Sequence, residues 1–200
     1  MRVAVCDYGA GNMRSVLAAF TRLGADARAA HDPADVLAAD LAVLPGVGSA
    51  ASAMRGLRER GLDAALQTRV AAGGRTLGIC LGLQLALEES EEDGGVLGLA
   101  VLPGRAVRLR EGRVPRIGWS PVEPVPARPE SARADSGLVP SFGEAFYFAH
   151  SYAAETPAAT AHSEEIVAAA EEGCFLGVQF HPEKSGAAGA RFLAGCLSRA

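Results

Sequence analysis

The sequence predicts an α/β fold, with a mostly parallel central sheet, helices on both faces of that sheet and an additional antiparallel strand region in the second half. In the first half, short apolar runs alternate with apolar stripes at helical spacing, which is typical of parallel strands joined by crossover helices. In the second half, strand-like runs follow one another without helices between them. The chain has 200 residues and no internal repeat or linker, so we expect one domain over residues 1–200.

The elements of the first half follow from periodicity and from residues that begin or end helices. Asp32 before Pro33 predicts a capped helix start with proline at its first position, and Gly24 predicts the end of the preceding helix. The expected strands cover 2–6, 41–44 and 76–79, and the expected helices cover 13–23, a segment from 33, 49–72 with a break near Gly61, and 81–87. Since ligands of such sheets collect at the carboxyl ends of the strands, we look for a site there.

The second half predicts strands and one closing helix. A proline-rich stretch without apolar periodicity predicts a surface loop. The expected strands cover 106–110, 116–122 and 144–150, the expected hairpin joins 166–170 and 174–180, the loop covers 121–140, and the helix covers 187–199.

Composition excludes several function classes. The formal net charge of -4 argues against nucleic acid as the main partner, because phosphate binding needs a basic surface. No apolar run reaches the roughly 18 residues of a membrane span, and Asp7 comes too early for a signal peptide. The four cysteines form no C-x-x-C pair, so we expect no zinc and a cytoplasmic location in which thiols stay reduced.

Cys80 is the candidate nucleophile. It lies between two glycines in segment 78–82, after an apolar strand and before a helical pattern, which is typical of a sharp strand-to-helix turn. The glycines let the backbone pass closely and leave room for a substrate. The helix N-terminus behind Cys80 favours the thiolate, which is the nucleophilic form. The bland alternative is a buried structural cysteine.

His181 and Glu183 are the candidate partners of Cys80. They lie two residues apart on a segment that we expect to be extended, where such side chains point to the same side. A carboxylate there holds the imidazole in one tautomer while the imidazole serves the thiol. His150 is an alternative base, but Glu183 is in position to orient His181.

Two glycine-containing segments have different interpretations. Gly46 and Gly48 flank Val47 after a buried strand, and main-chain amides there are able to form an oxyanion hole beside the nucleophile. Segment 9–12 resembles the start of a dinucleotide fingerprint, but Arg14 replaces its third glycine. We therefore expect no nucleotide site, no metal and no other cofactor.

Together these motifs resemble the class I, or triad, glutamine amidotransferases. The resemblance covers nearly the whole chain, through segments 8–12, 45–48, 78–84, 115–119, 147–152 and 181–185. Within that family the chain is most similar to the glutaminase subunits of imidazole glycerol phosphate synthase. Ser120 departs from the asparagine that usually follows Gly-Trp in these subunits.

The resemblance implies a flavodoxin-like domain and a role for each matched residue. Cys80 is the nucleophile, His181 the general base and acid, Glu183 its orienting carboxylate, and Val47 the source of the oxyanion amide. The residues implied to contact glutamine are Gly48, Gln84, Glu92, Ser151 and Tyr152. The residues implied to meet the partner subunit are Asn12, Trp119, Tyr147 and Lys184, the last being the single lysine of the chain.

The activity implied is hydrolysis of glutamine to glutamate and ammonia. The ammonia would pass to a cyclase subunit with a TIM-barrel fold, in a heterodimer that makes imidazole glycerol phosphate and aminoimidazole carboxamide ribotide in histidine biosynthesis. One alternative is the glutaminase subunit of another triad amidotransferase, such as those of anthranilate or pyridoxal phosphate synthesis, although the G-G-E-S-T segment typical of the latter is absent. Others are a stand-alone γ-glutamyl hydrolase and, disfavoured because all three triad side chains are present, a binding module.

Overall fold

The computed structural model describes residues 1–9, 12–125 and 144–198. Its main sheet has eight strands within these ranges, and the five at one end all run parallel. The remaining three strands pair antiparallel, which makes the sheet mixed but mostly parallel, as predicted. In spatial order the strands are β2 (Asp26–Ala30), β1 (Arg2–Cys6), β3 (Leu41–Leu44), β4 (Thr76–Ile79), β14 (Phe175–Val178), β13 (Ile166–Glu172), β12 (Ala159–Ser163) and β9 (Glu123–Pro124).

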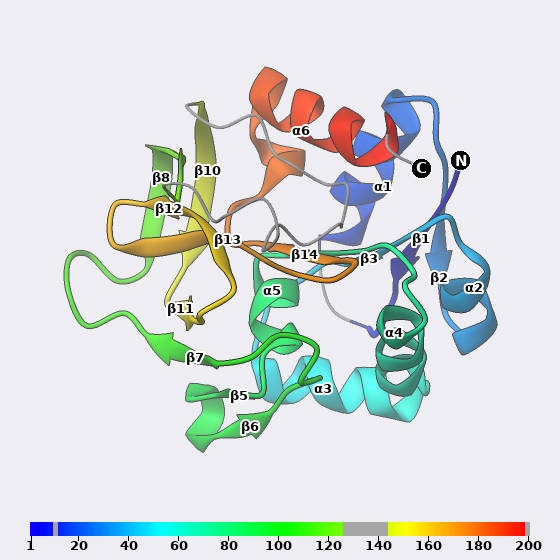
Figure 1. Cartoon of the computed structure of the whole chain (residues 1–200), viewed down its shortest axis with the longest axis horizontal. Coiled ribbons are helices and arrows are strands. Elements are labelled where there is room, and N and C mark those ends of the chain that lie inside the picture. Colours follow the sequence, from blue (N-terminus) through cyan, green and yellow to red (C-terminus); the bar gives the residue numbers. More distant parts are fainter. Residues whose placement is uncertain (10–11, 126–143, 199–200) are drawn as a thin grey trace.

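Helices cover both faces of this sheet (Figure 1). One face carries α1 (Met13–Arg22) and α6 (Gly186–Ser198), and the other carries α2 (Pro33–Ala38), α3 (Ala50–Glu59) and α4 (Leu62–Ala71). Asp32 caps α2 by accepting hydrogen bonds from the next two free amides, as the Asp-Pro pair predicted. Gly61 has a φ of 67°, a left-handed conformation that suits glycine and separates α3 from α4.

An aromatic cluster fills the core under α6. The rings of Phe146 and Phe180 are stacked with centroids 4.2 Å apart, and Phe192 of α6 meets both edge-on. Phe148 meets Phe180 edge-on at 5.9 Å. Each such pair contributes roughly 0.5–1.5 kcal/mol beyond its buried area. Because Phe180 directly precedes His181, this packing also fixes the chain that carries the predicted base.

The additional antiparallel region forms two small sheets. One pairs β8 (Arg116–Pro121) with β10 (Ala145–His150). The other has the order β11 (Tyr152–Glu155), β7 (Arg105–Arg108), β5 (Glu89–Ser90) and β6 (Val96–Leu97). Between the main sheet and the second small sheet lies α5 (Leu81–Ala86), whose Leu83 and Ala86 pack in a separate cluster with Ala106 and Ala154.

Several short strands were not predicted. The most important is β2, an edge strand of Asp26–Ala30 in which alanine and charged residues give a weak strand pattern. Its strand form comes from parallel pairing with all five residues of β1. Residues 121–125, expected in a surface loop, instead contain the end of β8 and the short β9, while 126–143 of that loop lie outside the described residues.

None of the helices in the described part of the chain is long and apolar enough to cross a membrane.

Candidate active site

Cys80 lies at the carboxyl end of β4 and at the N-terminus of α5. Its φ of 53° and ψ of -106° form a strained, sharp turn, which is the predicted nucleophile elbow. A methyl group on Gly82 would overlap the Leu44 carbonyl oxygen, and one on Gly46 would overlap the side chain of Leu81. Glycine is therefore required at both positions, because the loop after β3 packs closely against the start of α5.

His181 and Glu183 are brought together by a short turn. Pro182–Lys184 forms the 3₁₀ helix η3, so the prediction of an extended segment was wrong. The reason is Pro182, whose fixed φ favours the first position of a helix. In this turn Nδ1 of His181 lies 2.9 Å from Oε1 of Glu183, with both side chains almost completely buried.

The pKa of His181 reflects opposing effects. Burial acts to lower it, but hydrogen bonds to Cys80 and Glu183, together with the charges of both, raise the pKa to about 9. His181 is therefore protonated at neutral pH. Since Nδ1 is committed to Glu183, the other ring nitrogen serves Cys80.

His150, the alternative base, has a different environment. Its Nδ1 lies 2.9 Å from the carbonyl oxygen of Tyr152. Burial lowers its pKa to about 4, and the nearby charges of Arg116 and His181 act in the same direction. His150 is therefore neutral at pH 7 and contacts a backbone carbonyl, whereas His181 has a carboxylate partner.

A cavity of about 300 Å³ opens beside Cys80 and is also lined by His150. The cavity is lined by every residue predicted to contact glutamine or its oxyanion: Val47, Gly48, Gln84, Glu92, Ser151 and Tyr152. These residues come from the β3–α3 loop, α5, η1 (Glu92–Gly94) and the β10–β11 junction. Their contacts with glutamine remain predictions, but the structure places all six around one space.

Two of these side chains are already held by the protein. Gln84 donates from Nε2 to the carbonyl oxygen of Tyr152 at 2.7 Å. Glu92 accepts a hydrogen bond from the Ala50 amide at 2.7 Å, and burial raises the pKa of its carboxyl. This bond ties η1 to the first residue of α3, directly after the segment that carries Val47.

Gln179 is a residue of the candidate site that was not predicted from the sequence. It is completely buried after β14, and its Nε2 lies 3.6 Å from Sγ of Cys80. Its position two residues before His181 was an available signal, because extended residues two apart share a side.

Three residues of the predicted partner face, Trp119, Tyr147 and Lys184, lie close together. Trp119 is 57% exposed and meets the Tyr147 ring edge-on with centroids 6.1 Å apart. Nζ of Lys184 lies 6.0 Å from the centre of the same ring. Asn12, the fourth residue predicted for this face, is half-buried, and its Nδ2 lies 3.5 Å from Oε1 of Glu183. Ile117, 63% exposed, is a further apolar residue near this face that was not predicted.

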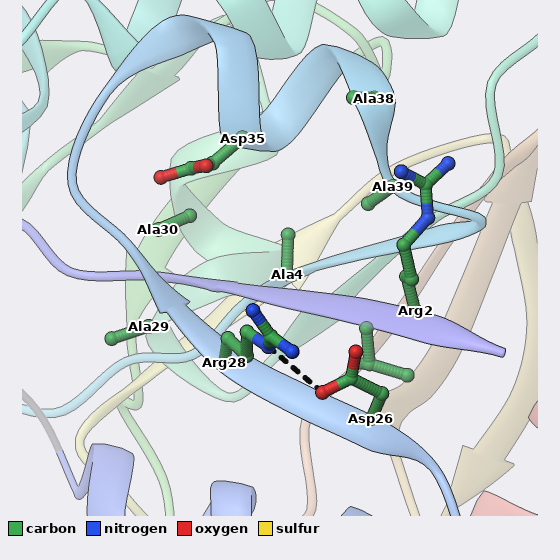
Figure 2. Close-up of a pocket in the computed structure, with 10 residues that line it drawn as sticks. Arg2, Ala4, Asp26, Arg28, Ala29, Ala30, Asp35, Ala38 and Ala39 are labelled. Atoms are coloured by element: carbon green, nitrogen blue, oxygen red, sulfur yellow. Dashed lines mark hydrogen bonds and ion pairs between the residues drawn. The ribbon is translucent and has the colours of Figure 1, made fainter.

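A second cavity of about 280 Å³ lies against β1, β2 and α2 (Figure 2). Arg28 points along its wall and pairs with Asp26 at 2.8 Å, and much of the remaining lining is alanine. It contains neither a cysteine nor a histidine. In the described residues no group of three or more His, Cys, Asp or Glu side chains is placed to hold a metal ion. Cys80, which lines the first cavity, therefore assigns the candidate site to it.

The fold and the site define a class of protein. A family model described as glutamine amidotransferase class-I matches residues 4–199. The chain therefore belongs to the class I glutamine amidotransferases. A crystal structure of a glutamine amidotransferase superimposes with a TM-score of 0.74 at 20% identity, covering 97% of this chain and 98% of that one, which supports the fold.

Relatives of closer sequence narrow the class. The chain is 44% identical over 200 residues to imidazole glycerol phosphate synthase subunit HisH of Symbiobacterium thermophilum, covering 96% of this chain and 92% of that protein. It is 45% identical over 194 residues to subunit HisH of Methanothermobacter thermautotrophicus, covering 94% and 93%. Within the class I family, the chain belongs with these HisH subunits.

Proposed function

We propose that the chain hydrolyses glutamine to glutamate and ammonia through Cys80, His181 and Glu183, as the glutaminase subunit of imidazole glycerol phosphate synthase in histidine biosynthesis. The observation that carries this proposal is the strained Cys80 elbow facing a buried His181–Glu183 pair beside a cavity of about 300 Å³. Family membership supports the same activity.

The first half-reaction needs a thiolate at Cys80 and a proton on His181. The Cys80 thiolate attacks the carboxamide carbon, a C–S bond forms, and the carbonyl electron pair moves to oxygen. An amide at Val47 stabilises that oxyanion, and removing one such donor costs roughly 10²–10³ in rate. When the C–N bond breaks, His181 gives its proton to the departing nitrogen and ammonia leaves. A γ-glutamyl thioester remains on Cys80.

The second half-reaction restores the enzyme. Neutral His181 removes a proton from water as the water oxygen attacks the thioester carbon. The C–S bond then breaks, glutamate leaves, and Cys80 returns as a thiolate beside protonated His181. Glu183, 2.9 Å from Nδ1 of His181, stabilises the imidazolium when it forms.

The ammonia product requires a partner. Free ammonia is protonated in neutral water and loses its nucleophilicity, so it must pass directly to a second site. We assign this site to a TIM-barrel cyclase subunit, which docks in a heterodimer on the face formed by Asn12, Trp119, Tyr147 and Lys184. An exposed tryptophan packed on a tyrosine is a composition favoured at protein interfaces, and it favours this interpretation over a stand-alone hydrolase.

We also propose that the chain works in the cytoplasm as a single domain. The four cysteines are free thiols, which is compatible with work in the reducing cytoplasm. The family match from residue 4 to 199 supports a single functional domain across the chain.

The test is glutamate release with and without the cyclase subunit. We expect slow hydrolysis by the chain alone and a large increase when the cyclase and its nucleotide substrate are present. With both subunits, glutamate and imidazole glycerol phosphate should form in a ratio near one. Rapid hydrolysis that is unaffected by the cyclase would instead indicate a stand-alone hydrolase.

A further inference from the structure

The mechanism above gives no role to Gln179, although its side chain touches the reacting sulfur. Gln179 is completely buried, Gln84 is 4% exposed and Cys80 is 6% exposed. Their side chains form one chain of hydrogen bonds: Gln84 Nε2 to Gln179 Oε1 at 3.1 Å, and Gln179 Nε2 to Cys80 Sγ at 3.6 Å. A buried amide in this position needs an explanation, since an apolar side chain would fill the same space at less cost.

The direction of these hydrogen bonds is fixed by a backbone group. The carbonyl oxygen of Tyr152 is only an acceptor, so the Gln84 group 2.7 Å from it must be the NH₂. That NH₂ also contacts the Gln179 amide, which must therefore turn its oxygen toward Gln84. The NH₂ of Gln179 is then left facing the Cys80 sulfur. Gln84 and Tyr152 thus set which end of Gln179 the sulfur meets.

We propose that Gln179 is a catalytic residue whose side-chain amide donates a hydrogen bond to the Cys80 thiolate, in an orientation set by Gln84 and the Tyr152 carbonyl. This proposal about Gln179 rests on the proposed function in one point only, that Cys80 is the nucleophile. An N–H donor is stabilising toward a thiolate and much less so toward a neutral thiol or a thioester sulfur. Gln179 therefore acts when the sulfur carries charge: as the thiolate that attacks glutamine and as the thiolate that leaves when the thioester C–S bond breaks.

This role differs from that of His181. His181 must lose its proton to ammonia, and it is neutral while the thioester waits for water. The amide of Gln179 does not titrate and keeps its donor through both half-reactions. When the thiolate leaves in the second half-reaction, Gln179 is the neighbour already poised to receive the returning charge.

The test measures the pH dependence of iodoacetamide alkylation at Cys80, with the modified residue identified by mass spectrometry. The titratable groups around the sulfur are His181 with Glu183 from η3, Tyr8 after β1, and His150 at the end of β10. All of them stay unchanged in Gln179→Met, which keeps the side-chain size and removes the donor. We expect its alkylation midpoint to rise by about one pH unit, which corresponds to about tenfold less thiolate below both midpoints.

A second variant and a control separate this role from general loss of structure. Gln179→Glu keeps a polar side chain of the same shape but presents an acceptor when ionised, so its midpoint should rise further than that of Gln179→Met. Thr76→Val removes a buried hydrogen bond at the start of β4, the strand that ends at Cys80, and should leave the midpoint unchanged. Comparable melting temperatures show that the variants are folded.

The result that overturns the proposal is a midpoint in both Gln179 variants equal to that of the unmodified chain. A shift of the same size in Thr76→Val also overturns it, since it would indicate loosening of the fold. The readout needs no glutamine, so the proposed function can fail without affecting it. In the cyclase complex, the deacylation rate of Gln179→Met should also fall about tenfold.

Discussion

His181 and Glu183 are separated by one residue, yet Nδ1 of the first and Oε1 of the second lie 2.9 Å apart in a buried ion pair. An extended chain would carry both side chains to one side without turning them toward each other. The 3₁₀ turn begun by Pro182 supplies that rotation. The predicted base and its predicted orienting carboxylate therefore form a local unit in the turn that begins at Pro182.

The two buried histidines predict opposite effects of pH on stability. The pKa of His181 is raised to about 9, so its stabilising contribution is complete below about pH 6.5 and is lost as pH rises toward 9. The pKa of His150 is lowered to about 4, so stability falls as pH drops from 6.5 toward 4. The free energy of unfolding should be measured with urea at pH 5, 6.5 and 9. In His181→Gln it should lose its fall between pH 6.5 and 9 only, and in His150→Gln its fall between pH 6.5 and 5 only. Equal effects of the two variants on both sides would contradict these assignments.

The Cys80 thiol should be the one that reacts with an electrophilic glutamine analogue. Burial raises the pKa of Cys6 to about 12 and also raises the pKa of Cys174, which keeps both as unreactive thiols at neutral pH. Peptide mapping after stoichiometric labelling should place the adduct on Cys80. Cys80→Ala should remove glutamate release while still binding the cyclase. Labelling of Cys196, or of another thiol, at the same rate would disprove the nucleophile assignment.

Removal of the base should be far more costly than removal of the alternative histidine. General acid–base catalysis contributes about 10²–10⁴ in rate, and we expect His181→Ala to lose most of that in kcat. Glu183→Ala should lose less, because it orients and polarises the base without moving a proton itself. Steady-state glutamate release should be measured for these two variants and for His150→Ala. A greater loss in His150→Ala than in His181→Ala would show that the base had been wrongly chosen.

Lys184 should couple glutamine hydrolysis to the cyclase reaction without affecting the chemistry at Cys80. Its ammonium lies over the Tyr147 ring on the predicted partner face, and the side chain is exposed. In the reconstituted complex, Lys184→Ala should raise the ratio of glutamate to imidazole product above one while glutamate still forms. Arg28→Ala, which removes an exposed cation at the far cavity, is the matched control and should keep the ratio near one. A ratio near one in both variants would remove Lys184 from this role.

The Cys80 elbow should not tolerate a methyl group at Gly82. That group would overlap the Leu44 carbonyl oxygen, and such overpacking costs typically 1–3 kcal/mol or more. Gly82→Ala should therefore lower both the melting temperature and the glutamate release rate. Gly195→Ala in α6 meets no atom within 4 Å and should stabilise the protein by about 1 kcal/mol. If the two substitutions had equal effects, close packing at the elbow would not be the reason for the glycine.

The fold could be predicted where local signals were strong. Asp32 with Pro33, and the apolar runs of β3 and β4, each act within a few residues, and their elements appear as expected. The edge strand β2 was missed because its alanines have low strand propensity and its form depends on pairing with β1. Short strands such as β5 likewise owe their form to distant partners.

In the candidate site, too, residues in local motifs could be predicted from the sequence, whereas a residue that depends on distant contacts could not. Cys80, His181 and Glu183 stand in short motifs whose residue types alone suggest their chemistry. The role of Gln179 was not predicted, because the orientation of its amide depends on Gln84 from α5 and on the carbonyl of Tyr152 at the start of β11. Gln84 is 68 residues from that carbonyl and 95 residues from Gln179, and no local pattern relates them.

The segment that carries Val47 is anchored at both ends. Gly46 is wedged against α5, and the amide of Ala50 is held by the Glu92 carboxylate. Between these points lies Gly48, exposed and with a φ of 104°, a conformation that a residue with a side chain rarely adopts. With its ends held, the segment can still undergo a crankshaft movement, in which the peptide plane before Val47 rotates while β3 and α3 stay in place. The predicted oxyanion donor, the Val47 amide, would turn relative to the Cys80 sulfur in such a movement, without any rearrangement of the core.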